Sequence, residues 1–422
     1  MLFPQSLVLI NRIETMSKPL LMAAALAAAV PLADAQPPSF AALDAAIDRA
    51  IAQQRIVGAV VLVAHGGQVV YRRAAGLADR EQRRPMREDA IFRLSSVTKP
   101  MVSAAALRLV EQGRLDLQAP VTRWLPDFRP QMPDGSMPVI TLHQLLTHTA
   151  GLSYGLLEPA DGPYRRAGIS DGLDDAGITL EENLRRIAGV PLAYPPGQGW
   201  RYSVALDVLG AVMEAATGSD LSLLLRQHVT GPLHMPDTGF RVVDGARLAT
   251  PYQDAQDGGA EPQRMAPQAQ VPFGEGRIRF APDRVWDAGA YPSGGAGMVG
   301  TAPDFMQFLL SLRPGAMSRL LKPETVALML RDHAGVQAQT QGPGWGFGYG
   351  WSVLVDPALA GTPQGKGTIQ WGGVYGHSWF VDPVHDLAVL AFTNTAIEGM
   401  SGAFAQDVRD AVYAALLPVA AP

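Results

Sequence analysis

A serine and a lysine stand three residues apart in the segment Ser96-Val97-Thr98-Lys99. On a helix this spacing places both side chains on one face. The free N–H groups and positive dipole end at a helix start also favour developing negative charge, as a reacting serine needs. The residues that follow, such as Met101, Val102 and Ala105, are apolar, and burial among them would lower the pKa of Lys99. The pattern predicts Ser96 as a nucleophile and Lys99 as its base.

The same spacing has an ordinary explanation. A Ser-x-x-Lys quartet occurs by chance in most chains of this length, usually as a helix cap followed by a solvated lysine. Here, however, a lysine in the first turn opposes the helix dipole, and the helix is too apolar to lie at the surface. A buried charge without a structural reason indicates function.

A third candidate is Tyr202, in the segment YPPGQGWRYSVALDVLG just before a predicted helix. A phenol held against Lys99 could take the hydroxyl proton or pass it on. The alternative is a loop tyrosine that packs on Trp200. The segment by itself favours that alternative.

A competing serine, Ser153, lies in the Gly-x-Ser-x-Gly segment GLSYG, residues 151–155. In esterases with this motif, a core strand precedes the serine and a helix follows it. Here TLHQLLTHTA upstream has helical spacing, and GLLEPADGP downstream contains two prolines where a helix should run. Asp382 and His385 could complete a triad, but they share one tight turn. We therefore expect the two glycines to be loop residues and Ser153 not to be the nucleophile.

The elements that must position these residues are predicted from periodicity. Phe40, Leu43, Ile47 and Ile51 recur at helical spacing behind Ser39 as a candidate N-cap. VGAVVLVA and QVVYRRAAG, separated by His-Gly-Gly, predict a hairpin. FRLSSVTKPMVSAAALRLVEQG then predicts a buried helix that ends at a left-handed glycine.

The C-terminal part is again rich in strand signals. FGYGWSVLV, IQWGG, GHSWFVDP and LAVLAFTN each predict one strand, the last two joined by a turn at 383–386. An amphipathic helix with Phe404, Val408, Val412 and Leu416 on one face closes the chain. Strands at both ends of the sequence imply one antiparallel sheet flanked by the terminal helices, an α+β fold.

Between these parts, short helical patterns alternate with stretches rich in Pro, Gly and Asp. The sequence therefore predicts an α/β domain with an antiparallel sheet, residues 36–112 and 291–422, and a helical, loop-rich inserted domain, residues 113–290.

Composition excludes several classes of function. The chain has 422 residues, 47% of them hydrophobic, and a net charge of −5, so we expect a large globular core and no nucleic-acid partner. It has no cysteine, which excludes a thiol nucleophile, disulfides and thiolate metal sites. The eight histidines show no metal-ligand spacing on one helix, so we expect no metal and no cofactor.

The N-terminus predicts export to the periplasm or the medium. Lys18 precedes an apolar run over residues 20–30, and the small-x-small triplet Ala33-Asp34-Ala35 follows, as in a signal peptide cleaved after Ala35. A membrane anchor is the alternative, but the run ends at Pro31 and is shorter than the roughly 20 residues of a spanning helix. The first 15 residues do not fit this pattern and suggest that Met16 is the working start. We expect residues 1–35 to be a signal peptide with an N-terminal extension, and no stable membrane insertion after cleavage.

Five motifs in order resemble the serine β-lactamase and penicillin-recognising superfamily, most closely its class C-like branch, the family VIII carboxylesterases. The motifs are FRLSSVTKPMVSAAALRLVEQGRLDL, LLTHTAGL, PPGQGWRYSVALDVLG, GGAGMVGTAPDFMQFL and WGGVYGHSWFVDP. The likeness covers about residues 40–417. It implies a β-lactamase/transpeptidase-like fold, Ser96 as nucleophile and Lys99 with Tyr202 as coupled base and proton relay. It also implies an oxyanion hole from the N–H groups of Ser96 and Val374.

Departures from the superfamily pattern bear on the substrate. Its lactamases and transpeptidases carry Lys-Thr-Gly where this chain has Trp371-Gly372-Gly373. An indole cannot clamp a carboxylate as a lysine does, but it can wall an apolar group. The alternative is that Trp371 only fills core. Val204 also stands where class C lactamases carry asparagine.

These observations predict an exported serine hydrolase that cleaves carboxylic esters with short acyl groups through an acyl-enzyme, with a small-molecule ester as its partner. One alternative is a β-lactamase or D-alanyl-D-alanine carboxypeptidase on the same scaffold. Another is a non-catalytic, penicillin-binding-like module. The oligomeric state does not follow from the sequence.

Overall fold

The computed structural model describes residues 39–175, 177–255, 261–313, 316, 320–338 and 340–417. These belong to a compact unit that begins at Ser39. The expected signal peptide and extension, residues 1–35, lie outside the described residues.

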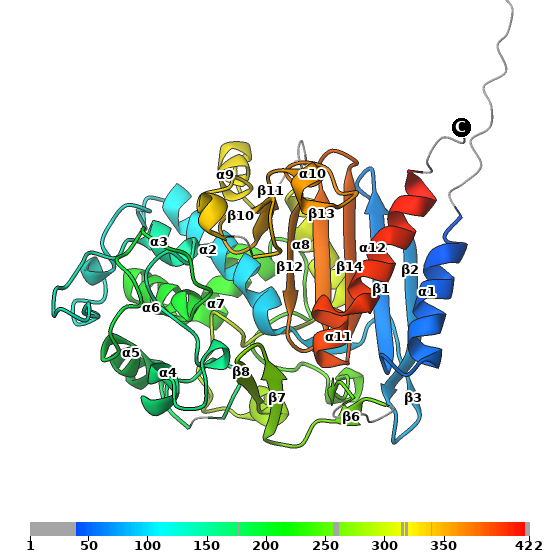
Figure 1. The fold of residues 1–422 in the computed structure, drawn as a ribbon, viewed down its shortest axis with the longest axis horizontal. Coiled ribbons are helices and arrows are strands. Elements are labelled where there is room, and N and C mark those ends of the chain that lie inside the picture. Colours follow the sequence, from blue (N-terminus) through cyan, green and yellow to red (C-terminus); the bar gives the residue numbers. More distant parts are fainter. Residues whose placement is uncertain are drawn as a thin grey trace, which may run out of the picture. The chain divides into compact units, whose positions relative to one another are not determined.

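The described chain is built around an antiparallel sheet of eight strands in the order β10-β11-β12-β13-β14-β1-β2-β3 (Figure 1). Its strands are β1 (Gly58–His65), β2 (Gln68–Asp79), β3 (Arg84–Pro85), β10 (Trp345–Phe347), β11 (Ser352–Leu354), β12 (Ile369–Gly373), β13 (His377–Asp382) and β14 (Leu387–Thr393). β1 pairs with β14 in a register that sets Ala59 opposite Thr393. The first and last strands of the sequence therefore meet at the middle of the sheet, as predicted.

The strand order explains why β1 reads as a continuous apolar run. Val60 and Leu62 point into one core, and Val61 and Val63 into the other, because alternate side chains of a strand face opposite sides. One expected strand, residues 347–355, is only partly right: Phe347 ends β10, residues 348–351 form a turn, and Ser352–Leu354 form β11. Gly350, with φ +105°, adopts a conformation open to glycine and interrupts the run.

Helices cover both faces of the sheet. α1 (Ala41–Ala52) and α12 (Ala403–Leu416) pack on one face, and α2 (Thr98–Glu111) and α8 (Ala302–Ser311) on the other (Figure 1). The predicted α+β fold with terminal helices on the sheet is confirmed. The predicted cap of the first helix is wrong: Phe40 is the N-cap residue and accepts no side-chain capping bond, so Ser39 lies one position outside.

The nucleophile helix α2 is buried on nearly all sides. It ends as predicted, because Gly113 has φ +69° directly after the last helical turn, a left-handed conformation that closes a helix at little cost for glycine. The buried residues of α2 belong to the same hydrophobic core as Val60 and Leu62 of β1.

The middle of the chain, between α2 and β9, is made mostly of short helices and hairpins. Its helices are α3 (Leu142–Leu146), α4 (Pro163–Arg166), α5 (Leu180–Ala188), α6 (Ala205–Thr217) and α7 (Leu221–Leu225). Two unexpected hairpins accompany them: β5 (Tyr252–Gln253) with β6 (Gln263–Arg264), and β7 (Ala269–Phe273) with β8 (Gly276–Phe280). The division into residues 36–112 with 291–422 and residues 113–290 stays a prediction.

Three helices and one small sheet complete the described part. The helices are α9 (Pro323–Met329), α10 (Pro357–Ala360) and α11 (Ala396–Ser401), and β4 (Ile91–Arg93) pairs with β9 (Val299–Thr301). Within the described residues no single helix has the length and apolarity to cross a membrane. One pair, Ala205–Thr217 with Leu221–Thr230, reaches that length and composition only across an 87° bend.

Candidate active site

The predicted nucleophile lies on a tight turn between β4 and α2. Ser96 is the middle residue of a 3₁₀ turn, Ser95–Val97, and α2 begins two residues later. Ser95 has φ +45°, an uncommon conformation for a residue with a side chain, and such strain gathers at functional sites. The turn holds the serine ahead of the helix, so Ser96 lies on a turn that the helical spacing did not reveal.

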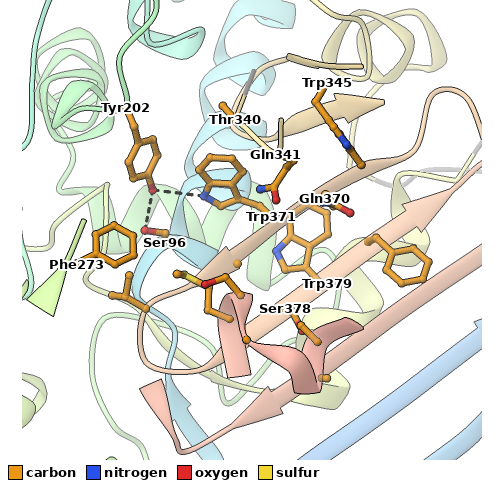
Figure 2. Close-up of a pocket in the computed structure, with 18 of the residues that line it drawn as sticks. Ser96, Tyr202, Phe273, Thr340, Gln341, Trp345, Gln370, Trp371, Ser378 and Trp379 are labelled. Atoms are coloured by element: carbon orange, nitrogen blue, oxygen red, sulfur yellow. Dashed lines mark hydrogen bonds between the residues drawn. The ribbon is translucent and has the colours of Figure 1, made fainter. Parts of the chain in front are cut away.

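The three predicted catalytic side chains meet at one point. The Tyr202 hydroxyl donates to Ser96 Oγ at 2.7 Å, and Lys99 Nζ lies 3.3 Å from the same oxygen. Figure 2 shows the phenol of Tyr202 between Ser96 and the indole of Trp371. This distance range suits proton transfer between a nucleophile and its base.

Lys99 is held in a pocket that disfavours its charge. The side chain is 1% exposed, and burial lowers its pKa to about 7, against the opposing influence of Asp207 and Asp171. Its amine donates to the Gly295 carbonyl at 2.7 Å and lies 4.4 Å from the centre of the Tyr202 ring. A substantial fraction of Lys99 is therefore neutral near pH 7 and able to accept a proton.

Tyr202 has the opposite character. Burial raises the pKa of its phenol, although the bonds from Ser96 and Trp371 partly offset this. The predicted alternative, packing on Trp200, is not what the structure shows. The Tyr202 ring packs instead against the rings of His148, Tyr154 and Trp371, with distances of 4.9 to 5.2 Å between ring centres. Tyr202 is thus a proton donor at neutral pH.

Two buried carboxyl groups lie behind the lysine. Asp207 Oδ1 accepts from Ser293 Oγ at 2.6 Å and from the Gly295 N–H at 3.4 Å, and so fixes the backbone whose carbonyl binds Lys99. Burial raises the pKa of Asp207 and raises that of Asp171 to about 7. A Cβ on Gly295 would lie 2.7 Å from both Asp207 Oδ2 and the Tyr154 hydroxyl, so only glycine fits there.

The segment Trp371-Gly372-Gly373-Val374 forms the other wall. A Cβ on Gly373 would lie 2.5 Å from the Leu94 carbonyl, and one on Gly372 would lie 2.6 Å from the His377 carbonyl. Gly373 therefore lets β12 approach the turn that carries Ser96, and Gly372 lets it approach β13. Val374 follows directly and lines the cleft with Ser96. Trp371 Nε1 lies 3.4 Å from the Tyr202 hydroxyl, so its indole faces the site and does not merely fill core.

The cleft above Ser96 has a volume of about 650 Å³, within the range of small-molecule sites. Its lining comes from both the sheet edge and the middle of the chain, and combines aromatic and aliphatic residues with polar and charged ones such as Asp171, Arg201 and Gln370 (Figure 2). Residues from these two parts include Trp200, Trp345, Trp371, Trp379, Leu156, Leu157, Leu173 and Phe273. Neutral, apolar groups fit this surface.

The competing serine, Ser153, lies outside the cleft. Ser153 is buried, it does not line the cleft, and its hydroxyl has no hydrogen-bond partner in the described part of the chain. Helix α3 precedes it and a 3₁₀ turn, Gly155–Leu157, follows, so the strand and helix of a nucleophile elbow are both missing at this site. Asp382 and His385 bond to each other in the turn after β13 and do not line the cleft.

The backbone around Ser153 supports Tyr202. The Val204 N–H donates to the Ser153 carbonyl at 3.2 Å, and the Arg201 N–H donates to the His148 carbonyl at 3.1 Å. The side chain of His148, 1% exposed, completes the support through Nδ1, 3.0 Å from Ser203 Oγ. Segment 148–153 is therefore a scaffold for the tyrosine loop.

Several of these residues were missed by the sequence analysis. His148 lay in the quoted motif LLTHTAGL, where a histidine inside an apolar segment was a usable signal. Phe273 lay in AQVPFGEGRIRF, whose alternating pattern around a glycine turn indicates a hairpin. Asp207 and Gly295 carried no local signal, because their partners are distant in sequence. In the described residues no group of three or more His, Asp or Glu side chains could hold a metal ion.

Comparisons with known proteins agree with this geometry. A family model described as beta-lactamase matches residues 43–414. The chain is 57% identical to Esterase EstB of Burkholderia gladioli over 380 residues, 89% of this chain and 95% of that protein.

Solved structures are also similar. One is EstCE1, described as a hydrolase with promiscuous acyltransferase activity, at a TM-score of 0.85 and 50% identity, covering 88% of this chain and 97% of that one. Another is unliganded simvastatin synthase from Aspergillus terreus, at a TM-score of 0.69 and 25% identity, covering 89% of this chain and 98% of that one. The predicted β-lactamase/transpeptidase-like fold is confirmed.

Proposed function

The chain belongs to the beta-lactamase family, and we propose that it is a serine carboxylesterase that cleaves neutral esters of short acyl groups through an acyl-enzyme. Membership of the family VIII esterase branch agrees with the 57% identity to an esterase. The observation that carries the assignment of roles is the meeting of Tyr202 and Lys99 on Ser96 Oγ, at 2.7 and 3.3 Å.

The contacts at Ser96 Oγ, together with the lowered pKa of Lys99 and the raised pKa of Tyr202, support the following proton transfers. Lys99, with a pKa of about 7, takes the proton of Ser96 as Oγ bonds to the acyl carbon. The N–H groups of Ser96 and Val374 hold the negative carbonyl oxygen. When the intermediate collapses, the bond to the alcohol oxygen breaks, and that oxygen takes the proton of Tyr202, which Lys99 replaces. Water then attacks the acyl-enzyme by the same path and releases the acid.

The decisive experiment combines covalent labelling with turnover. An active-site phosphonate should modify Ser96 in the intact protein, and hydrolysis of a short-chain nitrophenyl ester should disappear in Ser96→Ala and persist in Ser153→Ala. Labelling of another serine would refute the assignment. Absence of both labelling and turnover in the folded wild type would favour the non-catalytic, penicillin-binding-like alternative.

Positions 371 and 204 argue against β-lactams as the main substrates, although Arg201 also lines the cleft. Trp371 provides no cation for a substrate carboxylate, and Val204 provides no amide. We expect a chromogenic cephalosporin to be hydrolysed far more slowly than a nitrophenyl ester. Comparable rates would restore the β-lactamase and D-alanyl peptidase alternatives.

A second reaction of the same acyl-enzyme is acyl transfer to an alcohol. Trp200 and Trp371, which line the cleft and are partly exposed, offer flat apolar surface that an aryl alcohol covers better than water does. In this step the alcohol oxygen bonds to the acyl carbon, its proton goes to the catalytic base, and Ser96 Oγ leaves. Incubation with a vinyl ester and 2-phenylethanol in buffer should give the phenylethyl ester as well as the free acid. Free acid alone would exclude transfer.

We propose further that the chain is exported and that the mature protein begins at Gln36. The support is the order of Lys18, the apolar run and Ala33-Asp34-Ala35. N-terminal sequencing of the active fraction from a bacterial host tests this. An intact N-terminus in a cytoplasmic fraction would contradict it.

A further inference from the structure

A second cleft, of about 50 Å³, adjoins the first and shares Leu173 and Ala296 with it. Three arginines line this cleft, Arg93, Arg241 and Arg284. A cavity of this volume holds one or two water molecules. It is therefore too small for an organic substrate and large enough for a single small ion.

Arg93 is the most buried of the three. It is the last residue of β4, 8% exposed, with Nε donating to the Pro282 carbonyl at 2.7 Å and Nη1 to the Ala249 carbonyl at 3.0 Å. Within the described part of the chain Nη2 has no hydrogen-bond partner, and no carboxylate lies within 4.0 Å of the group. The two carbonyl groups accept hydrogen bonds from Nε and Nη1 of Arg93, but as neutral groups they do not balance its positive charge.

Arg165 provides a comparison within the same molecule. Its side chain is 4% exposed and lies 3.9 Å from the carboxylate of Asp171. Buried charges in proteins are ordinarily paired in this way, because an isolated charge loses its hydration without compensation. Burial accordingly lowers the pKa of Arg93, and only Tyr375 and the exposed Asp283 oppose this. Among the described residues, Arg93 is therefore a buried cation with no carboxylate within ion-pair distance.

The other two arginines add to the positive field. Arg284 donates to the carbonyls of Asp174 and Tyr291, at 3.1 and 2.8 Å. Arg241 donates to the carbonyls of Asp287 and Ala288, at 3.1 and 2.9 Å. Among the described residues neither has a carboxylate within ion-pair distance, and the one acidic residue at the cleft, Asp287, is exposed and accepts from the Gly289 N–H.

We propose that this cleft binds a small anion, a halide or an oxyanion of carboxylate size, as the counter-charge of Arg93. Arginine clusters with free N–H groups and no acidic partner are suited to such ions. The site is separate from the reaction centre but close to it, since Tyr375 lines the cleft and its N–H donates to Ser95 Oγ at 3.4 Å. The bound ion would stabilise the folded chain around the nucleophile turn.

The test measures thermal unfolding of the intact protein at constant ionic strength, with gluconate replaced stepwise by chloride, bromide or acetate. A ligand that binds only the folded state raises Tm in a saturable way. We expect saturation with at least one of these anions in the wild type and in Arg129→Met, since Arg129 is exposed and bonds only to a nearby carbonyl. Arg93→Met should abolish the dependence. The halide and acetate series distinguish a halide from an oxyanion.

A second measurement covers the case in which Arg93→Met does not fold. Wild-type protein should broaden the chloride-35 NMR signal, and a small excess of the anion that saturates in the Tm series should reverse the broadening. Crystals in bromide should show an anomalous peak between Arg93 and Arg284. A Tm that follows ionic strength alone, or the same anion dependence in Arg93→Met as in the wild type, would overturn the proposal. Where a halide is the anion that saturates, the absence of both signals would overturn it as well.

Discussion

Ser96 and Ser153 are two buried serines in neighbouring parts of the same molecule, and only one is in a position to react. Ser96 faces the large cleft and shares its oxygen with a phenol and an amine. Ser153 has no such neighbour, and its hydroxyl makes no hydrogen bond to the described residues. A sequence motif around a serine therefore says less about reactivity than the groups that the fold brings to its oxygen.

The largest effect should separate the two serines directly. Ser96→Ala removes the nucleophile, and by analogy with other serine hydrolases should lower ester kcat/KM by roughly 10³-fold or more. Ser153→Ala removes an unpartnered hydroxyl and should change kcat/KM by less than about two-fold, with stability unchanged or slightly higher. Steady-state hydrolysis and thermal unfolding of both variants measure this. Similar losses of kcat/KM in the two variants would contradict the assignment of Ser96 as the reactive serine.

The next effect concerns the phenol that marks the reactive serine. Tyr202→Phe keeps the ring contacts with His148 and Trp371 but removes the 2.7 Å bond to Ser96. General acid–base groups are worth about 10² to 10⁴-fold, so kcat should fall by at least about 10²-fold with little change in Tm. Tyr164→Phe, which removes a hydroxyl that accepts from the Ser153 N–H, is the matched control and should cost stability more than kcat.

A smaller effect should come from the scaffold that links the two regions. His148→Leu keeps a buried apolar group but loses the bond to Ser203, so Tyr202 should be held less accurately and kcat should fall by about 10-fold with KM nearly unchanged. Ser203→Ala should cost a similar factor, and the double variant little more, because one bond is lost in each case. His148→Asn should recover part of the loss. Full additivity would contradict a positioning role.

The smallest effect concerns the pH profile. Because neutral Lys99 is the active form, kcat/KM should rise with increasing pH through about 7. Asp207 raises the pKa of Lys99, so Asp207→Asn should move this rise to lower pH and increase the neutral fraction at pH 7 by at most about two-fold. Ser293→Ala keeps the carboxylate and should shift the profile less. An unchanged midpoint in Asp207→Asn would show that the carboxylate acts only through Gly295.

Much of the arrangement followed from local sequence. Periodicity gave the terminal helices, the β1–β2 hairpin and the last three strands, and the flanks of GLSYG correctly indicated a loop. Ser96 and Lys99 lie together as their spacing predicted, whereas the place of Tyr202 beside them was implied only by the resemblance to the family. Residues 347–355 were misjudged because Gly348 and Gly350 fold back a run that reads as one strand.

The remaining parts depend on tertiary contacts. Asp207 is bonded to the backbone of Gly295, whose carbonyl accepts from Lys99, and Gly295 lies far along the chain from both residues. The need for glycine at 373 arises from the carbonyl of Leu94, and the exposed cap at Ser39 was displaced by one residue because a helix start is weakly specified there. No local pattern carries such information.

The pairing of Ala59 with Thr393 has a consequence for when the protein can fold during its synthesis. A growing chain on the ribosome carries Ser96, Lys99 and Tyr202 well before it carries β12, β13 and β14, and until those arrive the central strand has no partner on one edge. Long-range pairing of this kind forms late and slowly. The activity therefore belongs to the finished chain alone, and an incomplete product, although it holds all three side chains, remains inert.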